Sequence, residues 1–217
     1  MERKLILKAQ PFALMPKLHN INERDMLDLG LKELNKFSLP EEIVGKKVII
    51  KRRIHQYDEE LFNLIDHSRD FLREFLFWVD DTKTLDNVKN VTDIFNNNWN
   101  EQKSFEYVFL DSRTGKMVGA GGIHTISYMH HWAEFGYYLD KSATGNGYIT
   151  EVVNLLTNTL FEHGIHRVVI ECDKQNTASE NVAKRCGFEY EGCQKQARLA
   201  YGKYRDELLY AKINPNF

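Results

Sequence analysis

The chain has 217 residues, of which 29 are Lys or Arg and 31 are Asp or Glu, so its formal net charge is −2. This length is enough for one well-buried core with an appended segment. Because the charges nearly balance, no bulk electrostatic field favours a nucleic acid or an anionic membrane as a partner. We expect no nucleic-acid or membrane partner. We also expect the protein to be a monomer or a homodimer.

The cysteines and the N-terminus indicate the compartment. Cys172, Cys186 and Cys193 are an odd number without a close pair, which argues against a disulfide framework and a four-ligand zinc site. Lys8 and Pro11 interrupt the apolar start of the chain, so a signal peptide is excluded. No run approaches the ~18 to 20 apolar residues of a membrane-spanning helix. The sequence therefore predicts a cytoplasmic protein without a metal site.

The prolines suggest how the chain is divided. Pro11, Pro16 and Pro40 come early, and the next proline is Pro215. Proline interrupts helices and inner strands, so regular structure can continue from Pro40 to Pro215. We predict an N-terminal extension of unknown role over residues 1–40 and one domain over residues 41–217.

Hydrophobic periodicity predicts alternating strands and helices in this domain. A strand at 46–54 precedes two helices around Ser68 and a helix at about 85–99. Three strands follow, at 105–110, 116–126 and 132–139, and "DSRTGK" forms the turn between the first two. A helix ending at Gly164, a strand at 166–172, a helix closed by Gly187 and a hairpin with a long polar connection complete the chain. The pattern predicts an α/β (α+β) domain, a mixed sheet with helices on both faces.

The stretch "KSATGNGYIT" places Gly145 and Gly147 where a strand gives way to a helix. A helix N-terminus has unbonded N–H groups and the positive end of the dipole, and glycine lets an anion approach the backbone. A Walker loop needs Lys-Ser/Thr after its last glycine, and a dinucleotide fingerprint needs a third small residue. Neither motif is present. The alternative to an anion site is that one glycine forms a turn and the other starts the helix.

The segments "EFGYYLDKSATGNGYITEVVNLL", "HRVVIECDKQNTASENVAKRCGF" and "GCQKQARLAYGKYRDELLYA" together resemble the GNAT acyltransferases. Within that superfamily they are most similar to the Rim-type ribosomal-protein N-acetyltransferases, which modify N-terminal serine or alanine. The resemblance extends from about Ile43 to Ile213. It implies a mostly antiparallel mixed sheet with a splayed central strand pair, and acetyl-CoA as co-substrate.

The resemblance also implies the residues that hold acetyl-CoA. The backbone of the glycine loop binds the pyrophosphate, and the pantetheine arm pairs with the splayed strand. Ser142 stands where the family has Gln or Arg, which removes one side-chain contact. The implied cofactor-binding residues are Tyr137, Tyr138, Leu139, Ser142, Gly145, Asn146, Gly147, Tyr148, Ile149 and Asn176.

Acetyl transfer to an amine needs a group that accepts the amine proton and a donor for the leaving thiolate. Glu134 is the candidate base, because it interrupts the apolar strand "WAEFGYYL"; its alternative is a solvated strand residue. Ser179 matches the Rim-type residue proposed to protonate the thiolate. For Ser179 and Asn176 the alternative is capping of a helix.

One position departs from the Rim-type pattern. A glutamate proposed there as a base is replaced by Arg198, which stays protonated and cannot accept a proton. Arg198 is then either a binder of an anionic acceptor or a solvated charge. Trp78 corresponds to the acceptor mouth of the Rim-type enzymes. We expect a protein N-terminus as acceptor; the alternatives are a small-molecule amine (an antibiotic, a polyamine or an aminoacyl nucleotide) and a regulatory acyl-CoA-binding module.

Overall fold

A computed structural model describes residues 34–217 of the chain. Up to residue 33, the predicted N-terminal extension lies outside the described residues. Residues 34–40 lead into the domain and pack on it: Leu39 is buried, and the carbonyl of Pro40 accepts a 3.0 Å hydrogen bond from the Tyr107 hydroxyl. No helix within residues 34–217 is long and apolar enough to cross a bilayer.

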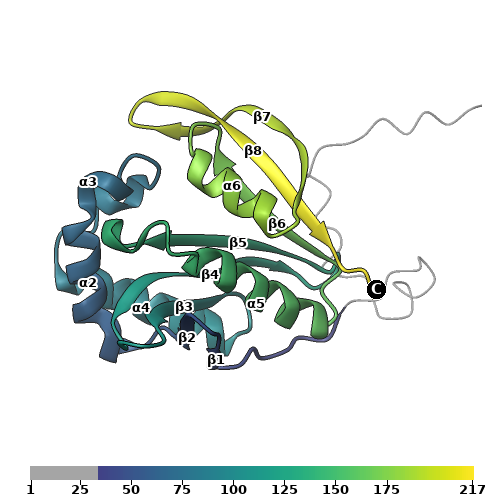
Figure 1. Ribbon diagram of the computed structural model, residues 1–217, viewed down its shortest axis with the longest axis horizontal. Coiled ribbons are helices and arrows are strands. Elements are labelled where there is room, and N and C mark those ends of the chain that lie inside the picture. The colour runs from purple at the N-terminus through teal and green to yellow at the C-terminus, as the bar shows by residue number, and fades with distance from the viewer. Residues whose placement is uncertain (1–33) are drawn as a thin grey trace, which may run out of the picture. The chain divides into compact units, whose positions relative to one another are not determined.

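The strands and helices follow the predicted order, and the structure adds the short strand β1 (Glu42–Val44) before them (Figure 1). The strands are β1 (Glu42–Val44), β2 (Val48–Arg52), β3 (Phe105–Asp111), β4 (Met117–Ser127), β5 (Trp132–Leu139), β6 (Arg167–Asp173), β7 (Glu189–Ala200) and β8 (Lys203–Ile213). The α-helices are α2 (Asp58–His67), α3 (Arg69–Leu72), α4 (Leu85–Asn100), α5 (Tyr148–Glu162) and α6 (Thr177–Arg185). Short 3-10 turns are η2 (His55–Tyr57), η3 (Phe77–Asp80) and η4 (Lys141–Ala143).

The strands form one eight-stranded sheet in the order β1-β2-β3-β4-β5-β6-β8-β7. Neighbouring strands are antiparallel except for β5 and β6, which run parallel and are connected through α5. The predicted mixed sheet is thus confirmed. The sheet has a core on each face, since successive residues of β3 alternate between them: Phe109 packs with α5 residues, and Val108 packs with α2 residues.

The C-terminal hairpin differs from the prediction. The expected long polar connection is wrong, because β7 and β8 continue to a turn made of Tyr201 and Gly202 alone. Both turn residues have positive φ, 50° and 72°, as a two-residue hairpin turn requires. The polar stretch that suggested a loop is strand with a register shift between Gln194 and Arg198. Polar residues persist there because much of β7, at the sheet edge, is exposed.

The start of α5 is fastened to the sheet at two points. The Glu151 carboxylate accepts hydrogen bonds from the backbone N–H groups of Lys46, Lys47 and Val48, at 2.9, 2.7 and 3.0 Å. The Tyr148 hydroxyl donates to the Asp111 carboxylate at the end of β3. The loop that precedes α5 is therefore attached to a helix end that the sheet itself holds.

The Tyr148–Asp111 contact gives a pH-dependent contribution to stability. The hydrogen bond from Tyr148, followed by those from the turn residues Thr114 and Arg113, outweighs desolvation and lowers the pKa of Asp111 from 3.8 to about 2. A lowered folded-state pKa stabilises the protein above the unfolded value, and this contribution is lost as the pH falls from about 4 to about 2. In urea titrations, Asp111→Asn should destabilise the protein most near neutral pH and progressively less below about pH 4. A difference from the wild type that is constant across pH would contradict this assignment.

Candidate active site

The central feature of the site is the gap that opens between β5 and β6. Their parallel pairing begins at Trp132 and Arg167 and ends at Phe135 and Ile170. Beyond that point β5 continues along β4 to Leu139, while β6 continues along β8. The predicted splayed strand pair is confirmed, and it leaves backbone groups of β5 facing the gap.

Two cavities meet at this gap. The loop-side cavity, about 590 Å³, lies between α3, the glycine loop and α6. The sheet-side cavity, about 890 Å³, extends over the sheet face toward α4. The two cavities share six wall residues: Phe75, Leu76, Tyr137, Tyr138, Asn176 and Ser179. A molecule in one cavity can therefore react with a molecule in the other at this shared wall.

The glycine loop supplies backbone to the loop-side cavity. Gly145 and Gly147 both have φ of +81°, a conformation that favours glycine, and Gly147 is the N-cap of α5 without a side chain to satisfy the helix N–H groups. Eight of the predicted cofactor-binding residues line this cavity: Tyr137, Tyr138, Leu139, Gly145, Gly147, Tyr148, Ile149 and Asn176. Uncapped N–H groups at a bare loop suit a phosphate, so the chemistry of this wall fits the pyrophosphate of coenzyme A.

Ser142 and Asn146, in contrast, do not line the loop-side cavity. The Ser142 N–H and hydroxyl both donate to Asp140 Oδ1, and the Asn146 amide donates to the Ala143 carbonyl. Asp140 also accepts a 3.0 Å hydrogen bond from Ser68 at the α2–α3 junction. Although burial opposes it, these bonds hold the pKa of Asp140 below its ordinary value. Ser142 and Asn146 therefore form hydrogen bonds within the loop and do not face the loop-side cavity.

Ser179 lies at the junction of the two cavities. Its hydroxyl is 2.9 Å from the Tyr137 hydroxyl, and its backbone N–H donates to Asn176 Oδ1 at 3.0 Å. Asn176 is therefore the N-cap of α6, which is the capping role that the sequence offered as its alternative. The Ser179 side chain takes no part in the cap. Burial raises the pKa of Tyr137 well above its ordinary value, against the effect of Ser179, so this pair stays protonated.

Two carboxylates line the sheet-side cavity near the point where the strands part. Glu134 on β5 pairs in register with Val169, and Glu171 follows the last paired residue of β6. Burial raises the pKa of Glu171, and the charge of Glu134 raises it further. Sequence reasoning identified Glu134 and missed Glu171. The signal was available, because Glu171 is the polar residue that interrupts the apolar strand "RVVIEC".

Arg198 also lines the sheet-side cavity, where its guanidinium is already paired. It lies 3.2 Å from Asp173 and 2.9 Å from Glu207, and it donates a 2.9 Å hydrogen bond to the Phe75 carbonyl. Arg205 pairs with the same Asp173. An anionic acceptor would have to compete with two carboxylates for Arg198. These contacts connect the β7–β8 hairpin to the segment after α3.

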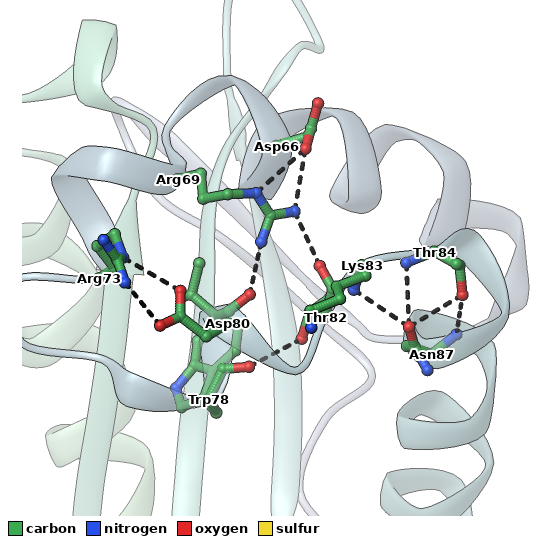
Figure 2. A network of polar contacts seen from close by, with 10 residues as sticks. Asp66, Arg69, Arg73, Trp78, Asp80, Thr82, Lys83, Thr84 and Asn87 are labelled. Atoms are coloured by element: carbon green, nitrogen blue, oxygen red, sulfur yellow. Dashed lines mark hydrogen bonds and ion pairs between the residues drawn. The ribbon is translucent and has the colours of Figure 1, made fainter. Parts of the chain in front are cut away.

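The segment between α3 and α4 forms the other wall, with Trp78 beside Tyr138 at a ring distance of 5.2 Å. Figure 2 shows the polar network that holds it. The Arg69 guanidinium donates to the carbonyls of Val79 (2.5 Å) and Thr82 (2.8 Å), and Arg73 forms an ion pair with Asp80 at 2.8 Å. These bonds hold the segment that follows Trp78 against α3, so the wall does not depend on apolar packing alone.

Comparison with known proteins identifies the class. Residues 49–189 match the acetyltransferase (GNAT) domain family, and the chain belongs to that family. The ribosomal-protein-serine acetyltransferase of Escherichia coli is 30% identical over 154 residues, which cover 70% of this chain and 85% of that protein. Acetyl-CoA is accordingly the acetyl donor, and the protein is an acetyl-CoA-dependent acyltransferase.

Solved structures show the same fold. A ribosomal-protein alpha-N-acetyltransferase, RimL, in complex with coenzyme A superposes with a TM-score of 0.75 at 26% identity, covering 79% of this chain and 96% of that chain. The microcin self-immunity acetyltransferase MccE, in complex with acetyl-CoA and AMP, has a TM-score of 0.77 at 23% identity over 83% of this chain and 98% of that chain. The second likeness is evidence for the fold alone.

Gly145 and Gly115 offer a matched test of the glycine loop. Both have positive φ, +81° and +70°, and an added Cβ would meet nothing within 4 Å at either position. Asp substitution should therefore cost similar conformational energy at both sites. Only Gly145→Asp places a negative charge in the loop-side cavity, and we expect it to weaken acetyl-CoA binding about tenfold or more. Calorimetry should show near wild-type affinity for Gly115→Asp, and equal affinities of the two variants would refute the loop assignment.

Proposed function

We propose that the protein transfers the acetyl group of acetyl-CoA to the α-amine of a protein N-terminus. The observation that carries this proposal is the junction of the two cavities, where a hydroxyl pair faces one side and carboxylates line the other. The likeness to proteins named as ribosomal-protein serine and alpha-N acetyltransferases supports the choice of acceptor.

The donor would occupy the loop-side cavity. Backbone N–H groups around Gly145 and Gly147 would hold its pyrophosphate, since negative charge is favoured at a helix N-terminus. The pantetheine arm would lie along the part of β5 that no longer pairs with β6, where extended chains find free backbone groups. In this arrangement the thioester would lie beside Ser179 and next to the sheet-side cavity.

In the proposed reaction the acceptor nitrogen attacks the thioester carbon, so a C–N bond forms and the C–S bond breaks. The proton released by the amine passes to Glu134, directly or through water. The sulfur takes the Ser179 hydroxyl proton, Ser179 recovers a proton from solvent, directly or relayed by Tyr137, and Glu134 releases its proton to solvent. The net result is one amide and one thiol, with no other reactant.

A reducing compartment suits this chemistry. Cys172, Cys186 and Cys193 are all free thiols. Burial raises the pKa of Cys172, which lines the sheet-side cavity, to about 11 against the effect of Ser179, so it remains a neutral thiol near the site. We therefore expect the protein to act in the cytoplasm.

The role of Ser179 can be tested without disturbing the helix cap. Ser179→Ala leaves the Asn176 cap intact and removes the hydroxyl that contacts Tyr137 and Cys172, so its cost in unfolding free energy should stay near ~1 kcal/mol. We expect kcat to fall roughly 10²-fold with acetyl-CoA affinity almost unchanged. Ser112→Ala, which loses one 2.9 Å hydrogen bond and lines neither cavity, is the control for stability. Equal kcat values in the two variants would exclude Ser179 as the acid.

The acceptor class can be tested by pH. An α-amine has a pKa of about 7.7 to 8.0 and a lysine side chain about 10.4, so near neutrality the α-amine is deprotonated several hundred times more often. N-terminal peptides should therefore react well and N-acetylated lysine peptides poorly, with rates rising toward the pKa of the acceptor. If Glu134 is the base, Glu134→Gln should lower kcat more than Glu171→Gln does. Efficient acetylation of lysine with no effect of Glu134→Gln would refute both the acceptor class and the base.

A further inference from the structure

The end of the sheet-side cavity near the start of β3 is a polar recess that the proposed reaction does not use. Ser104, Glu106 and His124 line this recess. Ser104 and Glu106 are only 3% and 4% exposed. Ser104 Oγ and Glu106 Oε2 are buried and have no hydrogen-bond partner within the described chain, residues 34–217. Buried polar atoms are nearly always hydrogen-bonded in folded proteins, so two such atoms lining one cavity indicate a place for a polar ligand group.

The strand register fixes where the recess lies relative to the reaction. Glu106 pairs with Gly122, and Gly122 pairs with Gly136 on β5. Adjacent strands lie about 4.8 Å apart, so Glu106 is about 10 Å from β5 across the sheet. Neither glycine has a side chain, so the space over this row is left to the His124 ring. The His124 ring lies over Gly136, since a Cβ there would come within 2.2 Å of it.

The charges around the recess favour a cation. The acidic side chains that line the sheet-side cavity are Asp81, Glu106, Glu134, Glu171, Asp173 and Glu207, against Arg53, Arg198 and His124 on the basic side. Arg198 is paired with Asp173 and Glu207, as described above. His124 Nε2 forms an ion pair with Glu106 Oε2 at 3.3 Å, and although burial opposes it, this carboxylate raises the pKa of His124.

Arg53 is the remaining cation of this cavity, and α4 holds it. Its Nε donates to Thr92 Oγ1 at 3.0 Å and its Nη2 to the Val88 carbonyl at 3.2 Å. An acceptor carboxylate placed in the recess would meet Glu106 and, further along the cavity, Glu134. A protonated nitrogen would instead gain attraction from both, and it could donate hydrogen bonds to Ser104 Oγ and to the Glu106 carboxylate, which it would share with His124.

We infer that the recess binds a second protonated nitrogen of the acceptor, about 10 Å from the amine that is acetylated. This rests on the proposed transfer to an amine in the sheet-side cavity and adds a specificity site to it. The nitrogen can come from a basic side chain that follows the N-terminal residue of a peptide, or from the far end of a polyamine. Glu106 and Ser104 accept its hydrogen bonds, and Glu106 supplies the opposite charge.

The test compares acceptors that differ only in the second charge. One pair is a peptide beginning Ser-Lys and the same peptide with norleucine in place of the lysine; the other is a linear diamine and the monoamine of equal length. Binding is measured by calorimetry on the complex with coenzyme A, where no turnover occurs, and kcat/KM by thiol release with acetyl-CoA. Hydrogen bonds to charged groups predict that the dication is favoured about tenfold to hundredfold in at least one pair. The pair that shows this preference identifies the source of the nitrogen.

Glu106→Gln keeps the size of the side chain and removes its charge, so the ratio between dication and monocation should approach one. Glu42→Gln is the control: Glu42 forms an exposed ion pair with Lys51 outside both cavities, and this variant should retain the wild-type ratio. Equal binding of dications and monocations by the wild-type protein overturns the inference without any variant, as does a preference that survives Glu106→Gln. If diamines react and peptides do not, the recess stands and the proposed protein acceptor is wrong.

Discussion

The site depends on the separation of two parallel strands that begin as partners. β5 and β6 pair only from Trp132–Arg167 to Phe135–Ile170, and each is then held by its outer neighbour. The backbone groups left in the gap would be costly if they stayed unpaired, because buried peptide groups need partners. An extended donor such as the arm of acetyl-CoA can satisfy them. In the proposed arrangement, the interruption in the sheet both binds the donor and puts its thioester between the two cavities.

The β7–β8 hairpin and the segment before α4 complete the walls on either side of this gap. Arg198 connects them by pairing with Asp173 and Glu207 while donating to the Phe75 carbonyl. An arginine at this position removes one possible base and leaves a structural cation in its place. In the proposed reaction, proton removal then falls to the carboxylates at the opening of the gap. Burial, and then the charge of Glu134, raise the pKa of Glu171, so Glu171 is better suited to take up a proton than an exposed carboxylate would be.

Local patterns in the sequence predicted most of the helices and strands and some of the residues that line the two cavities. The apolar stripe of α5, the glycine pair and the single acid in "WAEFGYYL" each carry their signal within a few residues. What failed depends on register between distant strands. Arg198 meets Asp173 only because β7 and β6 both pair with β8, and the free oxygen of Glu106 matters only because two glycines lie beside it across the sheet. The β7–β8 connection was misread because exposed edge strands lack the apolar alternation that marks a buried one.

An acidic acceptor cavity poses a conflict that the geometry resolves. Carboxylates attract the ammonium form of an amine and so raise its pKa, which strengthens binding but opposes the deprotonation that attack requires. A single nitrogen cannot be both the protonated group that the carboxylates bind and the deprotonated group that attacks the thioester. Two nitrogens can divide these two roles: the protonated one remains at Glu106, two strands from β5, and the other reaches the thioester near Glu134 and Glu171. The distance between the recess and the gap then selects acceptors by the spacing of their nitrogens as well as by charge.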